Sequence, residues 1–285
     1  MSSLSRRDFL KVAGLGLGSA MLATEAAQAA PPAEDANDHV GMLYDTTLCV
    51  GCHACSAACR DWNGTEVDLD PSGLYDAPTE LTDDTWTLIL LHQGENGNSF
   101  VKRQCMHCVD PGCVSGCPVH ALQKTAAGPV TYDPRRCIGC RYCMYACPFD
   151  IPRFEWEEVL PEITKCTLCA DRVAAGDGPA CAERCPTGAL IWGRRGDLLE
   201  AAEKRLVDHP NRYVNKVYGK DDAGGTSVLY LSHVPFEDLG LPDLGTEPIT
   251  RLSERIGNVF IPSILLGGPL VLAGIRFISK RDGEG

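Results

Sequence analysis

The sequence predicts an α+β fold in which one short unit recurs four times, followed by a helix and an extended segment. The main observation is that all sixteen cysteines of the 285 residues fall into four groups of four. Strand-like segments lead into the first and third groups, at Tyr44–Leu48 and Pro129–Asp133. The last three groups end in Cys-Pro. A strand, a cysteine loop and a Cys-Pro step that recur in this way form an internal repeat, which indicates two similar modules.

The third group gives the repeat a chemical meaning. Residues 137–148 have the spacing C-x2-C-x2-C-x3-C-P, which is typical of bacterial ferredoxins. Three thiolates at this spacing can hold three corners of one iron–sulfur cubane, and the fourth cysteine binds a second cluster. The four groups are Cys49, Cys52, Cys55 and Cys59; Cys105, Cys108, Cys113 and Cys117; Cys137, Cys140, Cys143 and Cys147; and Cys166, Cys169, Cys181 and Cys185.

Disulfide bonds and zinc are the alternatives for so many cysteines in an exported chain. Disulfides do not require the x2-x2-x3 spacing, and cysteines so close in sequence close only short loops. No cysteine is left over from the four groups. The pattern therefore favours iron–sulfur ligation over both alternatives.

The N-terminus resembles a twin-arginine export signal. Arg6-Arg7 precedes an apolar segment rich in glycine and alanine at Val12–Ala23, and Ala27–Ala29 forms a small-x-small cleavage site. We expect a signal peptide at residues 1–29 and a polar spacer at residues 30–39. Because the twin-arginine route carries folded proteins, clusters could be built in the reducing cytoplasm before export.

An insertion separates the first two cysteine groups. Residues 61–99 contain no cysteine, and Thr85–His92 and Ser99–Lys102 read as two strands joined by a glycine-rich turn. We expect this β-hairpin to cover a cluster rather than to dock a partner. His53 and His107 lie inside cysteine loops, but with four cysteines in each group we expect neither to be a ligand.

Helices and strands are also expected after the second and fourth groups. Val119–Gln123 is expected to form a helix after Cys117. Residues 196–250 are predicted to contain an amphipathic helix at Asp197–His209, a strand at Thr226–Ser232 and an extended segment broken by prolines.

The C-terminus predicts a single transmembrane helix at residues 256–278. Ile256–Ile275 is a run of 20 residues without a formal charge. At about 1.5 Å per residue, such a helix spans a hydrocarbon core of about 30 Å. Pro262 and Pro269 are tolerated in a membrane helix that has neighbours. A buried or interfacial helix is the alternative, and the run length favours the anchor.

Composition excludes several classes of function. The net charge of −12 and the lack of a basic stripe argue against a nucleic-acid partner. There is no Ser/His/Asp arrangement and no phosphate-binding loop. We therefore expect no catalytic residues and a role in electron transfer.

The chain resembles the four-cluster subunits of membrane-bound oxidoreductases. It is most similar to the hydrogenase-2 type ferredoxin subunit and to the β subunit of respiratory formate dehydrogenase. The segments that carry the resemblance are Gly41–Asp45, Cys105–Pro111, Lys165–Cys169, Cys185–Ala189 and Leu229–Pro235. This likeness implies two nested ferredoxin-like modules in residues 40–195, with 40–60 and 160–195 in one module and 100–155 in the other.

The family's ligand scheme can be placed on matching positions. It implies four [4Fe–4S] clusters, because every ligand position of this chain is cysteine. In the nitrate reductase β pattern, by contrast, one ligand is replaced and a three-iron cluster results. Lys165, next to Cys166, could raise a cluster's potential through its charge. The implied sets are Cys49, Cys52, Cys55 and Cys185 for cluster 1; Cys166, Cys169, Cys181 and Cys59 for cluster 2; Cys105, Cys108, Cys113 and Cys147 for cluster 3; and Cys137, Cys140, Cys143 and Cys117 for cluster 4.

The resemblance implies an electron relay on the periplasmic side of the inner membrane. A periplasmic catalytic subunit would supply electrons, and an integral membrane subunit would pass them to quinone. A hydrogenase partner is favoured because one chain carries both an export signal and a tail anchor. A formate dehydrogenase, or another molybdenum or tungsten enzyme, is the second hypothesis, supported by the likeness around Cys166–Gly193. A secreted, disulfide-rich binding protein is the third.

Overall fold

The computed structural model describes residues 35–65, 78–95 and 97–251, with single positions at Glu254, Ile256, Ile264, Leu265 and Pro269. The chain divides into two units, residues 1–35 and 36–285, and all elements below belong to the second. The predicted signal peptide, the first half of the spacer and nearly all of the predicted anchor lie outside the described residues. In the part that is described, no helix has both the length and the apolar composition needed to cross a membrane.

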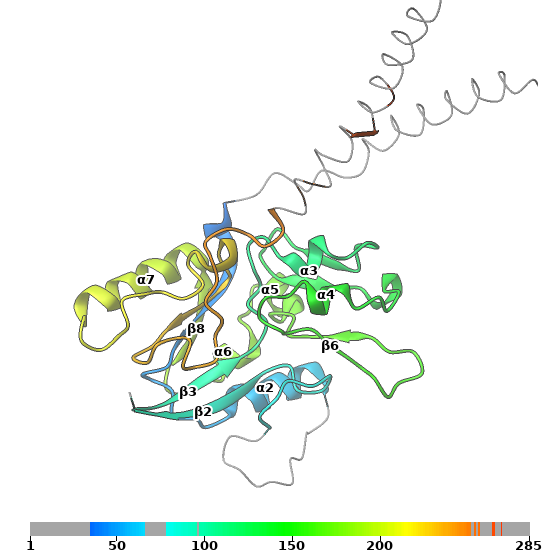
Figure 1. The fold of residues 1–285 in the computed structure, drawn as a ribbon. Helices are drawn as coiled ribbons and strands as arrows, with labels where there is room; N and C mark the ends of the chain where they lie inside the picture. Colours follow the sequence, from blue (N-terminus) through cyan, green and yellow to red (C-terminus); the bar gives the residue numbers. More distant parts are fainter. Residues whose placement is uncertain are drawn as a thin grey trace, which may run out of the picture. The chain divides into compact units, whose positions relative to one another are not determined.

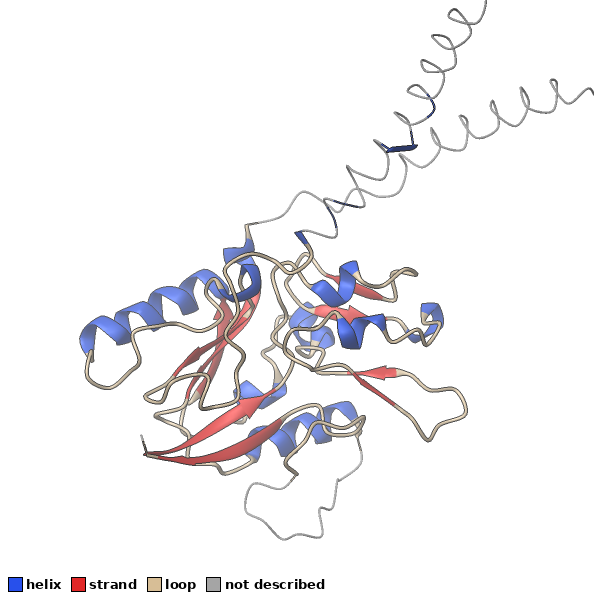
Figure 2. Ribbon diagram, viewed as in Figure 1, coloured by secondary structure: helices blue, strands red, loops and turns tan. Residues whose placement is uncertain are grey.

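A three-stranded sheet forms the centre of the described fold (Figures 1 and 2). Strand β1 (Val40–Asp45) lies in the middle, antiparallel to β8 (Leu190–Arg194) and parallel to β9 (Val228–Leu231). Residues 41–45 of β1 are all buried, because both faces of the sheet are covered. A continuous apolar run is what such a strand requires.

Helix α7 (Arg195–Asp208) covers one face of this sheet. Leu198 and Ala202 of the helix pack with Leu43 of β1 and Leu229 of β9 in one buried cluster. The predicted amphipathic helix is thus confirmed, with its start two residues earlier and its end one residue earlier. The opposite face of the sheet, with Met42 among its side chains, belongs to the cluster that contains many of the cysteines.

A buried carboxylate joins α7 to the first cysteine loop. Asp45 ends β1 and is completely buried, and it accepts hydrogen bonds from Arg205 of α7 and from the Tyr213 hydroxyl, both at 2.9 Å. It also accepts one from the Thr47 hydroxyl at 2.6 Å. A buried charge is stable only when paired and hydrogen-bonded, so these contacts fix the chain just before Cys49.

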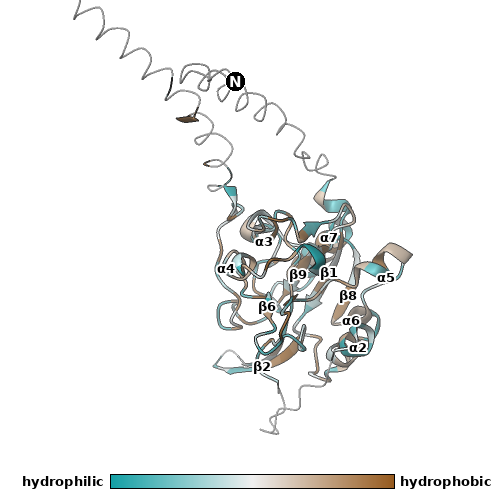
Figure 3. Cartoon of the chain, turned by 90° about the vertical axis from the view of Figure 1, so that its right-hand side faces the viewer, coloured by the Kyte–Doolittle hydropathy of each residue, from teal (hydrophilic) through white to brown (hydrophobic). Residues whose placement is uncertain are grey.

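The two predicted modules appear as two similar arrangements of strands and helices. In the outer arrangement, β1 leads into α2 (Ala54–Asn63), and α6 (Ala180–Glu183) leads back to β8, with α2 against α6 (Figure 3). The inner one has the order α3 (Gly112–Ser115), β4 (Leu122–Lys124), β5 (Val130–Tyr132) and α4 (Tyr142–Tyr145). There β4 pairs with β5 and α3 packs against α4.

The helix predicted at Val119–Gln123 is wrong. The chain forms β4 instead, because Leu122 and Lys124 pair with Tyr132 and Val130 of β5. A strand at this point matches the outer arrangement, where β8 follows Cys185 and pairs with β1. Formation of this local hairpin has overridden the predicted helix.

Two hairpins and several short helices complete the described fold. The predicted insertion hairpin is confirmed as β2 (Leu88–Gly94) and β3 (Gly97–Arg103), which pair over their full length. A second, shorter hairpin joins β6 (Arg153–Phe154) to β7 (Ile163–Thr164). The remaining helices are α5 (Ala170–Ala175), η2 (Ala36–Asp38), η3 (Pro134–Arg136) and η4 (Asp222–Gly224).

The packing of α7 predicts that Leu198→Ala lowers the free energy of unfolding by about 2–5 kcal/mol, through lost burial and the cavity left behind. Val207→Ala on the same helix is the matched control, because Val207 is 78% exposed, and we expect a change within about 0.5 kcal/mol. Urea unfolding followed by circular dichroism would measure both. Equal effects of the two substitutions would contradict the assignment of the buried face.

Candidate iron–sulfur sites

The first sulfur-lined cavity lies between the loop after β1 and the segment after α6. It has a volume of about 320 Å³, and its walls include Cys49, Cys52, Cys55 and Cys185. Backbone N–H groups donate to two of the sulfurs at 3.4 Å, from Gly51 to Cys49 and from Leu190 to Cys185. Residues some 130 positions apart in sequence are thus brought to one site, here called set 1.

Set 2 gathers Cys59 of α2 with Cys166, Cys169 and Cys181. These line a cavity of about 310 Å³. The Leu168 N–H donates to the Cys166 sulfur, and the Asn63 side-chain amide donates to the Cys59 sulfur, both at 3.4 Å. Burial is the main reason that the pKa of the Cys166 thiol rises to about 12.

Set 4 lies in the inner arrangement. Cys117, Cys137, Cys140 and Cys143 line a cavity of about 310 Å³. The Gly139 N–H donates to the Cys137 sulfur at 3.4 Å, and the Ala121 N–H donates to the Cys117 sulfur at 3.2 Å.

The thiols of set 3 act on one another electrostatically, and Cys105 also acts on Cys166 of set 2. Burial raises the pKa of Cys108 well above its usual value, and the charges of Cys105, Cys147 and Cys113 raise it further. Burial is also the largest cause, and the charge of Cys105 the second largest, that raises the pKa of Cys113 to about 12 and that of Cys147 to about 11. These four thiols therefore lie close enough to repel one another as thiolates.

Three of the four implied groupings thus each line one cavity, and the thiols of the fourth act on one another electrostatically. All sixteen are free thiols. Among the described residues, no three His, Cys, Asp or Glu side chains form a group that could hold a single metal ion. In sets 1, 2 and 4, all four cysteines line one common cavity. Four thiols around one space fit a cluster ligated by four cysteines, and sets 2 and 4 have buried members whereas the thiols of set 1 are half-buried or exposed.

Left-handed backbone conformations recur at fixed positions of the cysteine loops. The second residue after the first cysteine of each group has φ between 46° and 67°. Non-glycine residues adopt this conformation at a cost of about 1–3 kcal/mol, and it persists only where the surroundings demand it. In three of the loops this residue is the one whose N–H reaches the cysteine sulfur. The four residues are Gly51, His107, Gly139 and Leu168.

Three lysines bring positive charge into the sulfur-rich interior. Lys165, expected from the sequence to tune a cluster, is 4% exposed and donates to the carbonyls of Val130 at 2.5 Å and Cys166 at 3.1 Å. Lys124 donates to the His107 carbonyl at 3.2 Å. Lys102 of β3 is completely buried. Lys102 is not among the residues predicted from the sequence, because an isolated lysine in a strand carries no signal apart from its position three residues before Cys105.

The two histidines in the cysteine loops have different surroundings. His107 is completely buried, and its Nδ1 accepts a hydrogen bond from the Val130 N–H at 2.9 Å. Burial, together with Lys165 and Lys124, holds the pKa of His107 well below its usual value, so the ring is neutral. His53 is half-buried, with φ 54° just before α2, and it lines the set 1 cavity.

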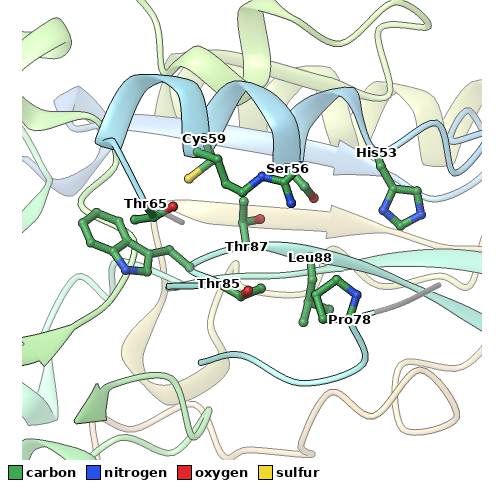
Figure 4. Close-up of a pocket in the computed structure, with 10 residues that line it drawn as sticks. His53, Ser56, Cys59, Thr65, Pro78, Thr85, Thr87 and Leu88 are labelled. Atoms are coloured by element: carbon green, nitrogen blue, oxygen red, sulfur yellow. The ribbon is translucent and has the colours of Figure 1, made fainter. Parts of the chain in front are cut away.

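A larger cavity of about 620 Å³ lies under α2 (Figure 4). Ser56 and Cys59 of α2 face Thr85, Thr87 and Leu88 across it. Cys59 is the one cysteine among its lining residues, so it offers no set of ligands. Thr87 lines both this cavity and the set 2 cavity.

Comparison with known proteins agrees with this chemistry. Residues 97–195 match the family of 4Fe-4S dicluster domains. The hydrogenase-2 operon protein HybA of Escherichia coli O157:H7 is 37% identical, over 98% of this chain and 96% of its own length. The iron–sulfur subunit of formate dehydrogenase-O of Escherichia coli K12 is 39% identical, over 74% of this chain and 72% of its own length. A protein of Nitratidesulfovibrio vulgaris is 40% identical, over 98% of this chain and 78% of its own length.

Two loop glycines offer a matched test of the loop geometry. An added Cβ at Gly51 would lie 2.4 Å from the Phe100 ring, whereas one at Gly139 would lie 3.9 Å from the Phe154 ring, and φ is 67° at both. Both substitutions strain the left-handed backbone, at a cost of about 1–2 kcal/mol each. We expect Gly51→Ala to destabilise the protein more than Gly139→Ala, because only Gly51→Ala also produces a steric clash. Thermal unfolding of the two variants measures the difference, and an equal loss would rule out the clash.

Proposed function

Because this chain belongs to the family that includes the hydrogenase-2 operon protein HybA and the iron–sulfur subunits of formate dehydrogenase, we propose that it is the electron-transfer subunit of a membrane-bound oxidoreductase. The observation that carries this proposal is the gathering of sixteen free cysteines into four sets inside one fold. Every cysteine belongs to a set, so none remains as a nucleophile.

Each set would hold one [4Fe–4S] cluster, which accepts and releases single electrons when bound. The residues of this chain ligate, exclude water and donate hydrogen bonds to sulfur, which are the protein's means of setting the potential. Lys165 would contribute positive charge near sets 2 and 3, because it lies next to Cys166 and its charge lowers the pKa of Cys113 against the larger effect of burial.

Hydrogenase is the proposed source of electrons. The likeness to the hydrogenase-2 protein extends over 98% of this chain, whereas the likeness to the formate dehydrogenase-O subunit covers 74%. A formate dehydrogenase partner is the alternative, supported by the similar identity of 39% within the shared part. The acceptor would be an integral membrane subunit that reduces quinone.

The proposed location is the periplasmic side of the inner membrane. It is supported by the twin-arginine motif at Arg6-Arg7 and by the uncharged run Ile256–Ile275. Export of the folded chain with a C-terminal anchor would leave the four sets outside and the basic tail inside.

Paired substitutions test which cysteines share a cluster. We expect Cys117→Ala to remove about four of sixteen iron atoms per chain, because loss of one ligand removes a four-iron cluster. Cys117→Ala with Cys140→Ala should remove no more, since both belong to set 4. Cys117→Ala with Cys108→Ala, in sets 4 and 3, should remove about eight. Iron analysis of anaerobically purified protein measures this, and the reverse pattern would contradict the assignment of Cys117.

The choice between the two electron sources is tested in membranes. Membranes from cells with and without this gene would be supplied in turn with H2 and with formate, and quinone reduction would be followed. We expect deletion to abolish only the H2-driven rate. Loss of only the formate-driven rate would establish the alternative partner and would leave the four cysteine sets unaffected.

A further inference from the structure

Lys102 of β3 is a completely buried cation. Its ammonium donates a hydrogen bond to the Thr87 hydroxyl. Among the described residues, no Asp or Glu forms an ion pair with it, and Thr87 is the one hydrogen-bond acceptor found for its three N–H groups. An isolated buried charge is strongly unfavourable unless other charges compensate for it.

Sulfurs are the nearby groups that can compensate, because Thr87, which binds the ammonium, lines the set 2 cavity together with Cys59, Cys166 and Cys181. Burial by itself lowers the pKa of Lys102, but thiolates at Cys55, Cys181, Cys59 and Cys166 outweigh burial and raise it. Cys55 belongs to set 1, and the other three belong to set 2. The effect is reciprocal, because the charge of Lys102 lowers the pKa of the three set 2 thiols against the larger effect of burial.

Two tyrosines of the central sheet hold β3 in the position that brings Lys102 to the sulfurs. The Tyr230 hydroxyl donates to the carbonyl of Lys102, and the Tyr44 hydroxyl donates to the carbonyl of Phe100, both at 2.9 Å. Thr87, which binds the ammonium, faces Cys59 and Ser56 of α2 (Figure 4). The ammonium is therefore placed by contacts from the sheet and the insertion hairpin.

The other two interior lysines differ from Lys102 in how their ammonium groups are bound. Lys165 donates to two backbone carbonyls and Lys124 donates to one. The thiolates that act on Lys124 are Cys108 and Cys105, both of set 3. Lys102 has no carbonyl acceptor among the described residues, and it is the lysine on which thiolates of sets 1 and 2 act together.

We propose that Lys102 is the shared counter-charge of clusters 1 and 2 and raises the reduction potential of both. The inference rests on the proposed function, because it requires clusters in sets 1 and 2. A positive charge stabilises the reduced, more negative form of a cluster, and it does so most strongly in a low-dielectric interior. Because the one charge raises the potential of two clusters, clusters 1 and 2 of the outer arrangement hold an electron more strongly than they would without Lys102.

The experiment is a redox titration, followed by electron paramagnetic resonance, of the full-length protein purified anaerobically. The variants are Lys102→Met, which removes the charge and keeps the length, and Thr87→Val, which removes the hydroxyl and keeps the charge. Lys124→Met is the matched control in the inner module. Iron is counted first, and a wild-type protein without about sixteen iron atoms would contradict the proposed function itself.

With iron present, we expect Lys102→Met to shift two of the four transitions to lower potential and to leave two unchanged. Thr87→Val should change these two much less, and Lys124→Met should move a different transition. Unchanged potentials in Lys102→Met, a uniform shift of all four, or an equal shift in Thr87→Val would overturn the role of the charge.

If Lys102→Met fails to bind all of its clusters, the iron content still tests the proposal. If Lys102→Met loses iron, the loss must be about eight atoms per chain and must be restored by Lys102→Arg, which keeps the charge. Loss of all sixteen atoms, or an equal loss in Lys102→Arg, would show that Lys102 acts through packing and would overturn the proposal.

Discussion

Thiolates that are crowded together in a protein interior repel one another, and the rest of this structure depends on that constraint. Burial is the largest cause of the raised thiol pKa in sets 2 and 3, and neighbouring thiolates add to it. Such a site stays charged only when positive charge enters it, from bound iron and from nearby lysines. The protein therefore places backbone N–H groups on the sulfurs and ammonium groups between the sets, at the cost of left-handed turns and buried cations.

The cysteine loops could be predicted from the sequence because their spacing carries the chemistry directly. Spacing identified all sixteen residues, and the glycine-rich turn located the insertion hairpin. The grouping of four cysteines into each site could not come from spacing. Cys185 joins Cys49 only because β8 pairs with β1 across about 150 residues, and this information came from the resemblance. The failed helix at Val119–Gln123 has a different cause, since the local hairpin of β4 with β5 decides that segment.

Lys102 shows why charge inside the fold is harder to predict than ligation. Ligands must follow a pattern, since a cluster has fixed corners, but a single cation can reach a cluster from any neighbouring element. Here it comes from the insertion hairpin, which the sequence suggested was only a cover. Two tyrosine hydroxyls hold that hairpin by its backbone carbonyls, and such contacts leave no trace in the spacing of residues.

The nesting of the two arrangements makes the inner sets available before the outer ones during synthesis. Sets 3 and 4 draw all their ligands from residues 105–147, so both are complete once that stretch has left the ribosome. Sets 1 and 2 each combine cysteines before residue 60 with cysteines after residue 165. A chain interrupted between these points would contain every cysteine of sets 3 and 4 but would lack cysteines of sets 1 and 2. Completion of sets 1 and 2 therefore depends on the long-range closure of the fold in which β1 pairs with β8 and β9, whereas completion of sets 3 and 4 does not require ligands from outside residues 105–147.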